Sequence, residues 1–202
     1  TGEILACVSY PTYDITKYKP KQNMFKNNKI KNAASTNENA GGGVYLDGGT
    51  LTIQNSTENN TVISGNSSTI GGGVAVTTAD SASTTGSFFM SGGTISENIV
   101  TNSSDGSKGN GSAVAVLGGL FTVSESITIN GDVYLFDDQT ITVSNNFVGG
   151  EVMITPYMYE SSDGVGVQVL KPIGGTSLTT EIVRKFEVTP QVLNSGGYEY
   201  WY

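Results

Sequence analysis

A triplet of glycines recurs in this chain after thirty residues, first at 41–43 and again at 71–73. Each copy is followed by a short apolar segment, and a looser third copy, GSAVAV, begins at residue 111. A period of this length is typical of arrays whose units cannot bury an apolar face alone and must stack on their neighbours. We interpret residues 77–86 as an insertion that supplies most of the extra ten residues in the second interval.

Within each repeat the apolar residues alternate with small or polar ones. Val44 and Leu46 show this period of two, and so do Leu51 and Ile53, which indicates short strands with one face turned inward. One repeat holds three such strands, VYL, TLTIQ and TVIS. Three strands suit one triangular turn of a parallel β-helix, with inward side chains and asparagines stacked in ladders on successive turns. The sequence therefore predicts an all-β, right-handed parallel β-helix.

An antiparallel β-sandwich is the main structural alternative, because short strands with regular turn signals also describe that fold. Near-repetition of the sequence favours the stacked array. Asn, Thr, Ser and Gly fill the polar segments, and these residues are poor formers of helix interiors.

We predict three parts along the chain. Residues 1–21 form an N-terminal strand or linker, 22–156 form the β-helix repeats, and 157–202 form a C-terminal β cap over the open end of the stack. The repeats include a further turn made of strands at 133–136, 140–143 and 152–155. The aromatic residues of the final segment have a second interpretation as a strip that stacks on sugar rings; these are Tyr198, Tyr200, Trp201 and Tyr202.

Charge is divided unevenly. Residues 17–31 contain six lysines, and we interpret this segment as a solvated linker or as a basic tether. Residues 32–202, in contrast, carry four basic residues and sixteen acidic ones. An acidic body repels phosphate backbones, so we expect no nucleic-acid partner. The chain has no uninterrupted apolar stretch of about 18 residues, so we expect no transmembrane segment. Cys7 is the single cysteine, so we expect neither a disulfide within the chain nor a thiolate metal site. Histidine, the commonest zinc ligand, is absent.

Residues 1–18, TGEILACVSYPTYDITKY, resemble a segment of the penicillin-binding transpeptidases. That family also needs a Ser-x-x-Lys and a Lys-Thr-Gly motif. The chain contains neither, so the resemblance implies no transpeptidase activity. The segment is interpreted as a strand that caps the first turn or as a fusion remnant.

A second resemblance rests on Phe25-Lys26-Asn27-Asn28, an F-x-x-N motif, followed by the recurring GGGV. Together they resemble the repeats of chlamydial polymorphic outer-membrane proteins and related bacterial adhesin-like proteins. The resemblance implies a secreted or surface-exposed bacterial protein that works in adhesion, display or spacing without catalysis. A host-surface component or a glycan is the ligand that this implies.

Candidate groups for chemistry are few. Asp47 lies one position away from the aspartate of calcium-binding glycine-rich nonapeptides, so we expect no calcium or other cofactor. Glycoside hydrolysis needs two converging carboxylates, and Asp137-Asp138 is the one adjacent pair. Arg184, the sole arginine, falls in the predicted cap. We therefore expect no enzyme, with a carbohydrate-active β-helix or a carbohydrate-binding module as the alternatives.

Overall fold

A computed structural model describes residues 24–26, 41–54, 60–78, 85–101, 111–175, 177–189, 191–192 and 198–199. The protein is an all-β structure built from parallel sheets, which confirms the predicted fold class at this level. In the described ranges, helix is confined to the 3-10 turn η1 (Ile173–Gly175) and the α-helix α1 (Thr180–Val183).

Three main sheets hold most of the strands. The six-stranded sheet, in spatial order, contains β17 (Phe186–Val188), β15 (Val152–Pro156), β13 (Asp132–Leu135), β10 (Val114–Val116), β6 (Val74–Thr77) and β2 (Val44–Asp47). The five-stranded sheet contains β16 (Leu170–Pro172), β14 (Ile141–Val143), β11 (Gly119–Val123), β7 (Gly86–Met90) and β3 (Thr50–Ile53). The four-stranded sheet contains β1 (Met24–Lys26), β4 (Val62–Ser64), β8 (Thr94–Ser96) and β12 (Thr128–Ile129). Two small sheets pair β5 (Ser67–Ser68) with β9 (Ile99–Val100) and β18 (Gln191–Val192) with β19 (Tyr198–Glu199).

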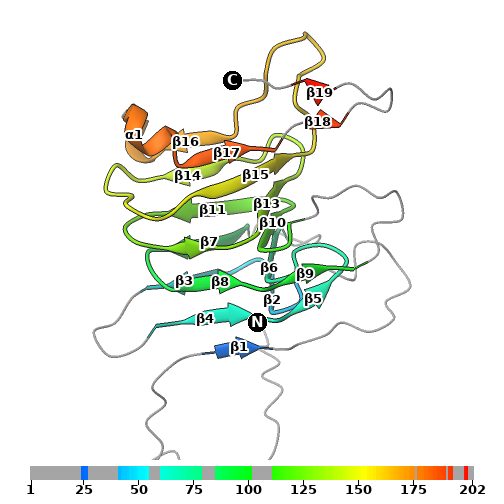
Figure 1. The fold of residues 1–202 in the computed structure, drawn as a ribbon, viewed down its shortest axis with the longest axis vertical. Helices are drawn as coiled ribbons and strands as arrows, with labels where there is room; N and C mark the ends of the chain where they lie inside the picture. Colours follow the sequence, from blue (N-terminus) through cyan, green and yellow to red (C-terminus); the bar gives the residue numbers. More distant parts are fainter. Residues whose placement is uncertain are drawn as a thin grey trace, which may run out of the picture.

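The chain visits the three main sheets in a fixed rotation. We call one passage through them a rung: β2, β3 and β4 form the first rung, β6, β7 and β8 the second, and β10, β11 and β12 the third. Figure 1 shows these strands stacked along the longest axis of the molecule. The three strands predicted in the first repeat are present as β2, β3 and β4, and a fourth short strand, β5, follows them within the same repeat. Every pairing within the three main sheets is parallel, so the antiparallel sandwich does not describe this part of the chain.

The fourth rung differs from its prediction. The strands predicted at 133–136, 140–143 and 152–155 are present as β13, β14 and β15 with slightly different bounds. However, β13 and β14 belong to the fourth rung, whereas β15 pairs with β13 and therefore starts a fifth rung. The third place of the fourth rung is taken by residues 147–150, where Val148 N donates to Glu125 O (2.9 Å) and Gly150 N donates to Ile127 O (3.3 Å). Buried Phe147 gives this segment its inward side chain.

Parallel pairing continues beyond residue 156. β16 pairs with β14, and β17 pairs with β15. Figure 1 shows α1 beside β16 near the upper end of the stack, and Ile182 of α1 is buried in the core. The division at 1–21, 22–156 and 157–202 stays a prediction, and the parallel series itself reaches Val188.

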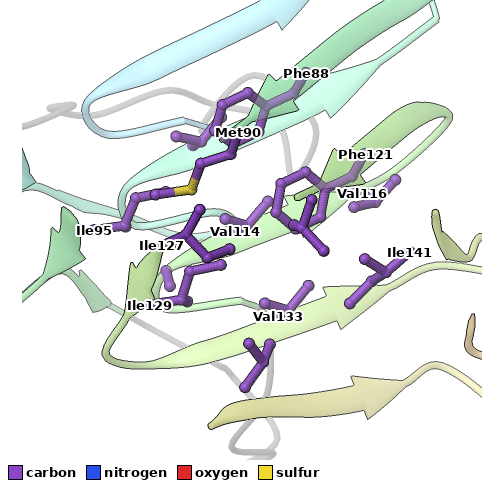
Figure 2. Close-up of a cluster of buried hydrophobic side chains, with 14 of the residues drawn as sticks. Phe88, Met90, Ile95, Val114, Val116, Phe121, Ile127, Ile129, Val133 and Ile141 are labelled. Atoms are coloured by element: carbon purple, nitrogen blue, oxygen red, sulfur yellow. The ribbon is translucent and has the colours of Figure 1, made fainter. Parts of the chain in front are cut away.

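Inward side chains of successive rungs form ladders. The five-stranded sheet contributes Leu51, Phe88, Phe121, Ile141 and Leu170 to one ladder. Phe88 and Phe121 stack with ring centroids 4.9 Å apart and ring planes inclined by 18°. Figure 2 shows both rings among Val114, Val116 and Ile141, which come from neighbouring strands. The alternation read from the sequence therefore identifies the core-facing residues.

The recurring glycines form the corner that precedes β2, β6 and, in the looser third copy, β10. Gly71 has a φ of +63°, a conformation that side chains other than glycine rarely adopt. Gly72 lies against the next rung, because a Cβ there would stand 2.6 Å from Ser112 O and 2.7 Å from Ile99 O. These two backbone constraints explain why the triplet recurs in the first two rungs.

The extra length of the second rung enters at two places. Two residues separate β2 from β3 in the first rung, but eight separate β6 from β7 in the second. Five residues separate β5 from β6, whereas thirteen separate β9 from β10. The expectation that 77–86 supplies most of the insertion was therefore incomplete. Thr78 and Thr85 close the first insertion by an antiparallel bridge.

A two-step asparagine ladder lies at the corner after the four-stranded sheet. Asn66 donates to Asn98 Oδ1 from its backbone N (3.0 Å) and from Nδ2 (2.9 Å). Asn98 Nδ2 donates to Ile63 O at 3.0 Å. Both asparagines are buried, so the bonds satisfy polar groups that water does not reach. Stacking of asparagines on successive turns is thus confirmed for this corner.

Replacing Asn98 with alanine is expected to lower the free energy of unfolding by about 1–3 kcal/mol, because buried groups of Asn66 and Ile63 lose their partner. Urea denaturation followed by circular dichroism measures the change. Asn130→Ala is the matched control, since Asn130 is exposed on the following rung. Equal effects of the two substitutions would contradict the role assigned to the ladder.

Candidate functional site

The aromatic residues predicted to bind sugars fall mostly outside the described part of the chain. Tyr198 lies in β19, which pairs antiparallel with β18. Tyr200, Trp201 and Tyr202 lie outside the described residues. Their role in ligand binding stays a prediction.

The acidic pair Asp137-Asp138 lies in an exposed turn after β13. Gln139 N donates to Phe136 O at 3.1 Å and closes this turn, and Asp137 adopts a φ of +52°. Neither residue lines the groove described next. The structure therefore does not bring this pair together with other polar groups of a candidate site. Arg184 lies exposed at the C-terminal end of α1, away from the pair in sequence and on another element.

A groove of about 640 Å³ lies where the chain passes from the four-stranded sheet to the six-stranded sheet. It extends from the corner before β10 to β17 and takes residues from β12, β13, β15 and β17 and from the segments that precede β13 and β15. Its lining residues are Ser112, Thr128, Ile129, Asn130, Gly131, Asp132, Gly150, Glu151, Val152, Met153 and Glu187. Hydroxyl, amide and carboxyl groups dominate its polar part.

Three hydrogen bonds fix Asp132 in this groove. Its Oδ1 accepts from Thr155 Oγ1 at 2.6 Å, and its Oδ2 accepts from the backbone N of Gly111 at 3.2 Å. Its own backbone N donates to Ser112 Oγ at 2.9 Å. These bonds link β13 to the corner below and to β15 above. Asp132 is therefore fixed in position by two neighbouring rungs.

Burial raises the pKa of the Asp132 carboxyl above its ordinary value of 3.8, against the opposing effect of the hydrogen bonds from Thr155 and Gly111. The folded state therefore holds this proton more tightly than the unfolded state does. As pH rises from the ordinary pKa of the unfolded chain to the raised pKa of the folded protein, the contribution of Asp132 to stability falls.

Asp132→Asn is therefore expected to gain stability relative to the wild type as pH rises, because the amide carries no charge to desolvate. Melting temperatures of both proteins, measured by circular dichroism from about pH 3 to about pH 8, give the difference at each pH. A difference that stays constant, or that changes in the opposite direction, would show that burial does not raise the pKa of this group.

Two further carboxylates share the groove with Asp132. Glu151 precedes β15 and Glu187 lies in β17, and both are exposed. Across the described ranges, no three acidic residues stand close enough together to hold a metal ion. The groove thus presents negative charge to solvent without the geometry of a metal centre.

An exposed aromatic pair lies further along the same strands. Phe136 follows β13 and Tyr157 follows β15, with ring centroids 4.9 Å apart and ring planes inclined by 44°. Phe136 is 41% exposed and Tyr157 is 55% exposed. Sequence reasoning missed this pair and the three groove carboxylates. The alternation of apolar residues in VYLF (133–136) and VMITPY (152–157) indicates that Phe136 and Tyr157 point outward. It does not show that the two rings are neighbours.

No helix in the described part of the chain is long and apolar enough to cross a bilayer. Comparisons of this chain with protein-family models, with curated proteins and with solved structures gave no match.

Proposed function

We propose that this chain is a right-handed parallel β-helix that acts without catalysis at the bacterial surface or outside the cell, in adhesion, display or spacing. The observation that carries the proposal is the unbroken parallel series of six strands from β2 to β17. Its strands are about 4.8 Å apart, so the series extends for roughly 24 Å. Right-handed crossovers are the rule between parallel strands.

A stacked array of this kind is suited to presenting side chains on flat outer faces. Alternate residues of each strand point outward, and the outward row of the five-stranded sheet includes Thr52, Phe89, Thr122 and Thr142. Phe89 is 40% exposed. Apolar and hydroxyl groups on a rigid face are typical of surfaces that bind other molecules. Together with the resemblance to adhesin-like repeats, they favour recognition over chemistry.

The hydrogen bonds of Asp132 also favour a structural or binding role over catalysis. Both of its carboxyl oxygens accept bonds from groups of the protein itself. A general acid has to present its proton to a substrate oxygen.

Two measurements test the proposed function. An antibody raised against the chain should label intact cells of the source bacterium or its culture medium, and beads coated with the protein should adhere to host cells or to an immobilised glycan. Labelling that appears only after lysis, together with beads that adhere no better than albumin-coated beads, would reject the proposal.

A carbohydrate-active enzyme is the second candidate, and one observation favours it. Asp132, with its raised pKa, lines the same groove as Glu151 and Glu187, and glycoside hydrolases use one carboxyl group of raised pKa beside one that stays ionised. Incubation of the purified protein with a panel of polysaccharides decides between the two candidates. Cleavage that is lost in Asp132→Asn would support the enzyme, whereas the surface-protein proposal expects no cleavage.

A further inference from the structure

We propose that the groove beside Asp132 and the Phe136–Tyr157 pair form one binding surface for a glycan that carries free amino groups. This inference rests on the proposed function, because it names the ligand class and the face that a recognition protein of this kind uses. Its occupant is an extended, β-linked chain of glucosamine units. Four observations lead to it.

The first observation is placement on one face. Val133 and Leu135 are buried, so Asp132, Tyr134 and Phe136 point to the opposite, outer side of the sheet. The register pairs Asp132 with Met153 and Tyr134 with Thr155. The backbone bond from Tyr157 N to Leu135 O (2.7 Å) continues this pairing past the end of β15.

It follows that the groove and the aromatic pair are two ends of one surface. At about 3.3 Å per residue, the four residue steps from Asp132 to Phe136 cover roughly 13 Å. A short oligosaccharide can contact both ends at once. An extended chain suits this surface because the outer face of a sheet is flat.

The second observation is the chemistry of the two ends. Sugar rings have apolar faces that stack on aromatic side chains, and Phe136 and Tyr157 leave about half of their surface exposed for such contact. Sugar hydroxyls need donors and acceptors. Ser112, Thr128 and Asn130 supply them in the groove.

The third observation is charge. Asp132, Glu151 and Glu187 line the groove, and its lining contains no lysine or arginine. Glycans with carboxylate or sulfate groups are repelled by such a surface, whereas ammonium groups are attracted. An ammonium group near Tyr157 also gains a cation–π contact. This complementarity selects an amino glycan over neutral and acidic ones.

The fourth observation is rigidity. Thr155 Oγ1 bonds Asp132 on one side and lies 2.8 Å from Thr189 Oγ1 on the other, and Tyr159 OH lies 3.1 Å from Thr189 Oγ1. This chain of hydrogen bonds ties β13, β15 and the residue after β17 together beside the groove. A surface that is ordered before binding loses little entropy when the ligand arrives.

Isothermal titration calorimetry of the full chain tests the inference with three probes of equal length: a chitosan hexamer, its fully N-acetylated counterpart, and an oligogalacturonate. We expect binding of the chitosan hexamer that weakens as salt is added, at least about tenfold weaker binding of the acetylated hexamer, and no binding of the oligogalacturonate. Equal affinity for the two hexamers would overturn the inference, and so would a preference for the acidic probe or no binding to any probe.

Two matched pairs of variants locate the site. Tyr157→Ala is expected to weaken chitosan binding about tenfold, whereas Tyr45→Ala, which removes an exposed ring from β2 at the far end of the six-stranded sheet, leaves it unchanged. Glu187→Gln is expected to weaken binding and reduce its salt dependence, whereas Glu160→Gln, an exposed acid that does not line the groove, has no effect. Reversal of either pair places the site elsewhere and overturns the inference.

Failure of this inference is separable from failure of the proposed function. A chain that labels intact cells and adheres to host cells, but ignores all three probes, keeps its proposed function and loses the amino-glycan surface. Circular dichroism of each variant confirms that a loss of binding is not a loss of folding.

Discussion

Replacing Phe88 with alanine is expected to lower the free energy of unfolding by about 3–5 kcal/mol. Phe88 is fully buried and stacks on Phe121 of the next rung at 4.9 Å. Its removal leaves a cavity between two rungs, and the fixed spacing of parallel strands prevents the sheets from closing over it. The loss includes the apolar transfer energy of the ring and the contacts that its neighbours no longer make.

Phe89→Ala is the matched control, because Phe89 follows Phe88 on β7 but points outward and is 40% exposed. We expect this substitution to cost about 1 kcal/mol or less. Chemical denaturation of both variants measures the difference. Similar losses at the two positions would show that the alternation of β7 does not place Phe88 inside and Phe89 outside.

Gly72→Ala is expected to destabilise the protein by about 3 kcal/mol, at the upper end of what overpacking usually costs. The added Cβ would stand 2.6 Å from Ser112 O and 2.7 Å from Ile99 O, both backbone atoms. Ser112 O also accepts from Gly73 N at 3.0 Å, so it cannot move away without weakening the contact between the second and third rungs.

Gly150→Ala provides the comparison, because a Cβ at Gly150 meets no atom within 4 Å. We expect this variant to unfold at nearly the same denaturant concentration as the wild type. If Gly72→Ala were equally harmless, close approach between rungs would not be the reason for the middle glycine of the triplet.

Particular residues show how far sequence reasoning reached. Val44, Leu46, Leu51 and Ile53 alternate in the sequence, and the structure turns all four toward the core. Asn66 and Asn98 form a buried ladder at the expected kind of corner. Alternation and repetition are local properties, so they can be read without knowledge of the partners. The parallel direction of the main sheets followed from the same repetition.

The fourth rung shows where such reasoning failed. The sequence predicts a strand at 152–155 in the same turn as β13, yet β15 pairs with β13 and begins the next rung. The segment 147–150 takes the place of a regular third strand, and Phe147 is its buried apolar side chain. One apolar residue does not make an alternating pattern, so the sequence does not predict a strand there. The acids Asp132, Glu151 and Glu187 were missed for a related reason. They come from β13, from the residue before β15 and from β17, and they share a groove only because these strands stack.

The sequence alone therefore determined the all-β class, three of the strands of the repeat, the residues that face the core and the glycine corner that starts each of the first three rungs. These features depend on the local periods of the chain and on the backbone freedom of glycine. Tertiary structure alone decided the register between rungs of unequal length, and with it the burial of Asp132 and the contact of Phe136 with Tyr157. Register sets which distant residues become neighbours, and it depends on the lengths of the connecting segments between rungs as well as on the apolar pattern of each strand.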